Sequence, residues 1–185
     1  YKFMPVKAEP NDYIQSMGGV DALTSYDILK NKCAWGNLSD PQVYVDPESL
    51  NNSVRPKTNF MRVAQALVDQ GKNAEAVEMM DTYIKHFPDS KVPFDIYMVP
   101  YAEIYYKAGA TDKGNKLVGR VAEICNENLE YYYAFPADRT QYFEQDIQQS
   151  LGILKRMSML AAENNQADLA DRINKMFEAR IGPMK

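Results

Sequence analysis

The chain has 185 residues, 45% of them hydrophobic, which is enough for one domain with a sizeable core or for a short array of repeats. Its 21 basic and 25 acidic residues give a net charge of −4, without a cluster of Lys and Arg, so a protein that binds nucleic acid through phosphates is not expected. No apolar run approaches the roughly 20 residues that cross a bilayer, and no signal peptide is recognisable. The sequence begins at Tyr1 rather than at an initiator Met, and we expect a piece of a longer protein.

Residues 1–56 differ in composition from the rest, with five prolines and a Gly18-Gly19 pair. We expect an irregular segment that packs along the helical part of the chain. One helix is predicted within it, over residues 21–32, with Asp21 as its N-cap. Its apolar side is predicted to comprise Leu23, Ile28 and Leu29.

The run from residue 33 to 56 contains only a short strand-like stretch, at 43–45. A connection of this length without structure of its own is unusual inside a compact domain. We therefore expect it to be held against the helices by Trp35, Val43 and Tyr44.

From Thr58 onward the hydrophobic period changes to that of a helix, about 3.6 residues. A first helix ends at Gly71, and a second, capped by Asn73, ends at Pro88. The short connection makes the two helices antiparallel, with Gly71 in a left-handed conformation. Ala76 is predicted at their closest approach. The expected core positions are Phe60, Val63, Ala64 and Leu67 in the first helix, and Ala76, Val77, Met80, Tyr83 and Ile84 in the second.

This layout recurs twice along the chain. A shift of 38 residues places Gly109 at the connector and Gly114 at the close approach. A shift of 94 residues gives a weaker copy, with Asn165 and Ala170 at these positions and Asn174 in place of an apolar residue. Residues 126–150 are extra, with a helix predicted from about residue 136 to 164. The recurring core positions are Met98, Tyr101, Ala102, Tyr105, Val118 and Val121 in the second copy, and Leu154, Met157, Ser158, Ala161 and Phe177 in the third.

The unit at residues 57–90 resembles a tetratricopeptide repeat, a 34-residue helical hairpin. Phe60, Ala64, Ala76 and Pro88 match its large aromatic, its two small positions and its late proline. The resemblance implies an all-α fold, a right-handed superhelix of about three hairpins preceded by the irregular segment 1–56. The repeat domain would cover residues 57–185, with units near 57–90, 95–128 and 151–184.

A second resemblance covers roughly residues 1–130. The runs DILKNKCAWGNLSDPQVYVD, RPKTNFMRVAQALVDQGKNAEAVEMMD and VPYAEIYYKAG are similar to the C-terminal region of bacterial multi-pass membrane proteins that resemble protein O-mannosyltransferases of the GT-C class. It implies that the chain is the extracytoplasmic, periplasmic tail of a membrane-embedded glycosyltransferase. The catalytic carboxylates of that class belong to an N-terminal part that is absent here, so no catalytic residue is carried over.

Residue types that carry chemistry are sparse in this chain. The single histidine, His86, ends a helix, where a cation is favoured. Cys33 and Cys125 form no metal-binding pair and are expected either as buried free thiols or as a long-range disulfide. The acidic stretches 127–130 and 138–146 are predicted as solvated helix faces, with a glycosidase-like carboxylate pair as the alternative. We expect no cofactor and no metal.

The chain also has 13 tyrosines. Tyr97, Tyr101 and Tyr105 share one helix face and are expected in the repeat core, whereas Tyr106 and the run 131–133 fit a core less easily. Exposed tyrosines bind sugars and peptides with little loss of entropy, so a ligand surface is the alternative interpretation.

From these patterns we expect a non-catalytic module that binds a protein or an extended peptide and does not itself contact a membrane. The alternatives are a stand-alone peptide-binding adaptor and an enzyme with carboxylate chemistry. In tetratricopeptide arrays the first helix of each hairpin lines a concave groove. The corresponding contact residues are Met61, Gln65, Val68 and Asp69 in the first hairpin, Val99, Glu103, Tyr106 and Lys107 in the second, and Lys155 and Met159 in the third.

Overall fold

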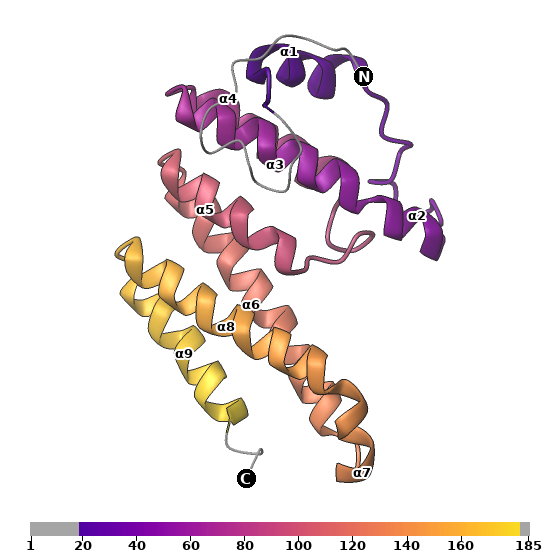
Figure 1. Ribbon diagram of the computed structural model, residues 1–185, viewed down its shortest axis with the longest axis vertical. Helices are drawn as coiled ribbons and strands as arrows, with labels where there is room; N and C mark the ends of the chain where they lie inside the picture. Colours follow the sequence, from indigo (N-terminus) through magenta and orange to yellow (C-terminus); the bar gives the residue numbers. More distant parts are fainter. Residues whose placement is uncertain (1–18, 182–185) are drawn as a thin grey trace. The chain divides into compact units, whose positions relative to one another are not determined.

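The computed structural model describes residues 19–181, and all regular secondary structure within them is helical (Figure 1). The chain divides into two compact units, residues 1–93 and 94–185. The division expected at residue 56 stays a prediction. Residues 19–53 belong to the same unit as the first hairpin, and Trp35 packs on the core of that hairpin.

The helical elements alternate with short connections in both units. The first unit contains α1 (Ala22–Asp27), a π-helical turn (Ile28–Lys32), α2 (Pro47–Asn52), α3 (Val54–Asp69) and α4 (Asn73–His86). The second contains a 3-10 turn (Ile96–Met98), α5 (Val99–Lys107), α6 (Thr111–Tyr133), α7 (Ala137–Thr140), a second 3-10 turn (Gln141–Phe143), α8 (Glu144–Glu163) and α9 (Ala167–Ile181).

The first predicted helix forms, and its N-cap is confirmed: the Asp21 carboxylate accepts a hydrogen bond from the N–H of Thr24 at 3.2 Å. Its predicted apolar side is wrong, because Leu23 and Ile28 are exposed. The helix changes to a π-helical turn at Ile28, which breaks the 3.6-residue period on which that prediction depended. Lys30 of this turn forms an ion pair with Glu78 of α4 at 2.7 Å.

Helix α2 was not predicted. The carboxylate of Asp46 caps it by accepting from the N–H of Ser49 at 3.0 Å, and Pro47 occupies its first turn. An N-cap Asp followed by Pro is a recognised start signal, so the sequence did carry the information. The expected strand at 43–45 does not form. The Lys91 ammonium instead binds the carbonyl oxygens of Pro41 and Val43, at 2.7 and 2.6 Å.

Trp35 is half-buried and holds the irregular segment against the first hairpin. Its ring lies 5.2 Å from that of Phe60 on α3 and 5.5 Å from that of Phe87 at the end of α4. Its indole N–H donates to the carbonyl oxygen of Leu29 at 3.3 Å. Tyr44, expected to help in this anchoring, is 83% exposed and does not.

The three predicted helical hairpins are present as α3–α4, α5–α6 and α8–α9. Their connectors share one backbone geometry, with a left-handed residue at Gly71, Gly109 and Asn165, where φ is 72°, 80° and 60°. At each connector the following N–H bonds to the carbonyl oxygen five residues earlier, a Schellman motif. These bonds are Lys72 to Leu67 (2.8 Å), Ala110 to Tyr105 (2.8 Å) and Gln166 to Ala161 (2.9 Å).

The offsets of 38 and 94 residues therefore relate equivalent structural positions. Two details of the prediction are wrong. Asn73 is the first residue of α4, and Lys72 is its N-cap without a side-chain hydrogen bond. Tyr97, expected in the core, is 44% exposed because it precedes α5 in a 3-10 turn.

Small residues occur where the two helices of each hairpin are predicted to approach closely. Ala76, Gly114 and Ala170 are all buried, each five residues after its connector. In the third hairpin the Ser158 hydroxyl donates to the backbone carbonyl of Ala170 at 3.0 Å, which shows how near α8 is to α9. A larger side chain at these positions would separate the helices.

Gly114 provides a direct test of this packing. A Cβ atom at this position would lie 2.9 Å from the ring of Tyr106, so Gly114→Ala should lower the free energy of unfolding by about 1 kcal/mol or more, despite the better helix propensity of Ala. Gly152 of α8 is exposed and has open space around it, so Gly152→Ala should raise stability by about 1 kcal/mol. Chemical denaturation measures the change in unfolding free energy of both variants. A change of the same sign in the two variants would contradict the contact between Gly114 and Tyr106.

Residues 126–150 lengthen the second and third hairpins rather than forming a separate element. Helix α6 runs on to Tyr133, and α8 begins at Glu144. The helix expected to run unbroken over 136–164 is divided: α7 is followed by the 3-10 turn at Gln141–Phe143, and α8 starts at Glu144. Figure 1 shows α6 and α8 side by side, continuing past the end of α9 to α7.

Candidate peptide-binding face

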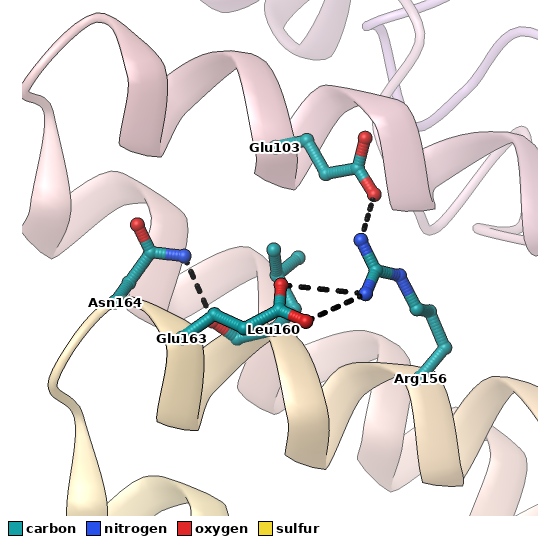
Figure 2. Close-up of polar contacts among 5 residues, drawn as sticks. All are labelled: Glu103, Arg156, Leu160, Glu163 and Asn164. Atoms are coloured by element: carbon teal, nitrogen blue, oxygen red, sulfur yellow. Dashed lines mark hydrogen bonds and ion pairs between the residues drawn. The ribbon is translucent and has the colours of Figure 1, made fainter.

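An arginine joins the first helices of the second and third hairpins (Figure 2). The Arg156 guanidinium on α8 binds the carboxylate of Glu103 on α5 at 2.6 Å, and its other terminal nitrogen lies 3.2 Å from the carboxylate of Glu163. The hydrogen bond that the Arg156 guanidinium donates to Glu103 raises the pKa of Arg156, so the group stays charged. All three side chains are partly exposed, which makes this a polar surface that solvent reaches.

The predicted contact residues of this second unit differ in accessibility. Lys107, Lys155 and Met159 are exposed, and Val99 and Glu103 are half-buried. The Lys155 ammonium lies 5.4 Å from the ring centre of Phe177 on α9, a cation–π distance. Glu103 contacts α8 of the next hairpin through Arg156. That these residues share one face stays a prediction.

Tyr106 is not a surface residue, and its assignment to the groove is wrong. It is buried, with its ring against the backbone of Gly114, because glycine leaves the space that a side chain would fill. Its hydroxyl donates to Asn115 at 2.7 Å, and the amide of Asn115 donates to Gln166 at 2.7 Å. Tyr106 therefore links the second hairpin to the connector of the third.

The contact residues predicted in the first hairpin lie on α3, in the other unit. Met61, Gln65 and Val68 are half-buried, and Asp69 is exposed. The Gln65 amide donates to the Asp69 carboxylate at 2.7 Å. A groove that continues over all three hairpins stays a prediction.

Sequence reasoning missed Arg156 and Glu163, which adjoin Lys155 and Met159 on α8. No local pattern identifies Arg156, because its partner Glu103 is 53 residues away. Glu163, seven residues after Arg156, shares its helix face and could have been recognised from that spacing.

Two hollows lie among the described residues of the second unit. The wider one is open and lies over α6 and α9, where Lys116, Arg120 and Arg172 alternate with Glu123 and Asp168. The smaller, of about 200 Å³, lies near the far end of α6 and α8. It is lined by Phe94, Asp95, Ile96, Val121, Ile124, Cys125, Asn128, Tyr132, Asp146, Gln149, Ser150 and Ile153.

The other residues considered as catalytic or metal-binding candidates, the acidic side chains and His86, do not form one cluster. Glu127 and Glu130 form ion pairs with Arg120 and Arg180, at 3.5 and 3.1 Å. Desolvation lowers the pKa of His86, so burial opposes the cation expected at this helix end. Within residues 19–181, no three His, Cys, Asp or Glu side chains come together in a metal-binding arrangement.

Both cysteines are free, so the disulfide alternative is not formed, and Cys33 is half-buried rather than buried. Burial raises the pKa of the Cys125 thiol to about 12. Because the thiolate is the reactive form, iodoacetamide at pH 8 should alkylate Cys33 in the native protein and Cys125 only after unfolding. Mass spectrometry of the modified peptides checks this order, and comparable rates at the two sites would contradict it.

Comparisons with protein families, with curated proteins and with solved structures found no match to this chain. None of the helices within residues 19–181 combines the length and the hydrophobicity needed to cross a membrane. The functional argument therefore depends on the residues and contacts described above.

Proposed function

We propose that this chain is a tetratricopeptide-like, right-handed array of helical hairpins that binds an extended peptide or protein segment without catalysing a reaction. The observation that carries the proposal is the face formed by α5 and α8. Arg156 and Glu103 link two equivalent first helices there, and neighbouring positions present Lys107, Lys155 and Met159 to solvent.

This face suits a peptide better than a small ligand. It offers cations, carboxylates and an adaptable methionine along two helices, in place of a deep apolar cavity. The lone pairs left on each partly exposed carboxylate can accept hydrogen bonds from peptide N–H groups or cationic side chains. Equivalent positions on α3 would extend the contact if the hairpins form one superhelix.

The second part of the proposal concerns context. The resemblance of residues 1–130 to the C-terminal region of membrane glycosyltransferase-like proteins favours a role as an extracytoplasmic tail that holds an acceptor or partner protein. The coding sequence upstream of Tyr1 tests this: a region with many apolar spans supports the tail, and its absence leaves the stand-alone adaptor.

Peptide selection tests the binding function. Peptides of 12 residues are selected from a displayed random library on the whole chain, and their affinity is then measured by fluorescence anisotropy. Met159→Asp should weaken the selected peptides by about tenfold, because it places a charge in the contact area. Lys175→Asp, at an exposed position of α9, is the matched control and should leave affinity unchanged. Equal effects of the two variants would refute the face.

The carboxylate enzyme is the weaker candidate. Glu103 pairs with Arg156, and Glu130 pairs with Arg180. A glycosidase instead needs two carboxyl groups that face each other across the bond to be cleaved.

A further inference from the structure

The far end of the α6–α8 extension carries a cluster of aromatic rings. Tyr131 lies 5.1 Å from Phe135, and Tyr132 stacks on Phe143 at 5.1 Å. The rings of Phe135 and Phe143 are also 5.1 Å apart, so the four form one group. Tyr131 is 59% exposed, and Tyr142, in the adjoining turn, is 78% exposed. We call these five residues the aromatic tip.

The aromatic tip lies beyond the point at which α9 stops covering α6. The Arg180 guanidinium, in the last turn of α9, binds Asn126 at 2.9 Å and Glu130 at 3.1 Å. Among the described residues, the extension from Tyr131 onward consists of the end of α6, α7, the Gln141–Phe143 turn and the start of α8 (Figure 1). Exposed aromatic groups of this kind mark interaction sites more often than isolated apolar side chains do.

The segment that carries the aromatic tip, residues 126–150, is also acidic. Residues 126–150 contain five acidic residues and one basic residue, a net charge of −4, which equals the net charge of the whole sequence. Glu127 and Glu130 are neutralised by arginines. Asp138, Glu144 and Asp146 are exposed, and none of the three makes an ion pair within the described residues. Asp138, Glu144 and Asp146, together with the one cation Arg139, leave a net charge of −2 in the segment that carries the aromatic tip.

The hollow of about 200 Å³ adjoins this cluster, since Tyr132 belongs to both. Val121, Cys125 and Ile153 supply apolar lining, and Asp146 supplies a carboxylate. Long cationic side chains bury an aliphatic stem while their charged head stays in contact with polar groups and water. Aromatic faces attract such cations, and carboxylates at the rim add to this attraction.

We propose that the aromatic tip and the adjoining hollow form a second docking surface, which binds a Lys- or Arg-bearing segment of a partner protein. Charge complementarity selects the occupant: a basic segment neutralises the three free carboxylates, whereas an acidic segment would be repelled. The stem of one Lys or Arg lies in the hollow with its head near Asp146, and a neighbouring cation stacks on Tyr131. This surface is distinct from the α5–α8 face.

An NMR titration of the whole chain tests the proposal. The probes are a 12-residue Gly/Ser peptide with three Arg, its copy with three Lys, and its copy with three Gln. The Arg and Lys peptides should shift the amide signals of residues 126–150, with binding that weakens as salt rises. The Gln peptide should shift none of them. Absence of shifts with the cationic peptides, or shifts spread evenly over the acidic surface, would overturn the proposal.

Two variants identify the groups involved. Tyr131→Leu keeps an apolar side chain but removes the ring, and Asp146→Asn removes one charge, so each should weaken the Arg peptide by about threefold to tenfold. Tyr44→Ala and Asp171→Asn, at an exposed tyrosine and an exposed carboxylate elsewhere, are the matched controls. Circular dichroism verifies that the variants fold. Equal weakening of peptide binding by the control variants would overturn the proposal. Signals of the aromatic tip that shift with protein concentration alone would also overturn it, because they would indicate a second copy of the chain as the occupant.

Discussion

Replacing Trp35 with alanine should lower the free energy of unfolding of the first unit by about 2–3 kcal/mol. The Trp35 ring contacts two aromatic residues that are almost fully buried, Phe60 and Phe87, and its removal leaves a cavity between them. We place the loss at the lower end of the range for aromatic-to-alanine changes because Trp35 is only half-buried. Urea denaturation followed by circular dichroism measures it.

Tyr44→Ala is the control for this experiment. Tyr44 belongs to the same irregular segment but is 83% exposed, so its loss should change stability by less than about 0.5 kcal/mol. Similar midpoints for wild type and the Trp35 variant would show that the segment is a free linker. Deletion of residues 1–56 should likewise expose Phe60 and Phe87 and lower solubility.

Ala76→Leu should destabilise the first hairpin by about 1–3 kcal/mol, because the added atoms have no space. Ala76 is fully buried on α4, and Ala64 is fully buried on α3. Thermal unfolding of the variant gives the effect. The control is Ala74→Leu, at an exposed position two residues earlier on the same helix. It makes the same substitution without overpacking a core and should leave stability nearly unchanged. Equal stability of the two variants would contradict the helix pairing.

The features that were predictable from sequence are those that local chemistry determines. A residue that can adopt the left-handed region is followed five positions later by a small side chain, so Gly71, Gly109 and Asn165 could be aligned without a structure. The start of α2 was equally local, and Asp46 with Pro47 was simply not recognised.

The features that failed depend on distant residues or on a change of helical period. The ring of Tyr106 is buried because Gly114, on another helix, has no side chain. The ion pair between Glu103 and Arg156 joins positions that no spacing rule relates. The exposure of Leu23 follows from how α1 lies on its neighbours, and periodicity alone does not specify that.

The hairpins are held by contacts between residues close in sequence, whereas the N-terminal segment is held by contacts with distant residues. This difference affects the order of folding. Each hairpin closes over a connector of a few residues, so its chain entropy cost is small and it can form early. The contacts that hold the segment join residues about 50 positions apart, as between Lys91 and Pro41, so they form late. A newly made chain should therefore pass through a state with hairpins formed and Phe60 and Phe87 uncovered. Docking of Trp35 ends that state and, with it, the interval in which the chain is most prone to aggregate.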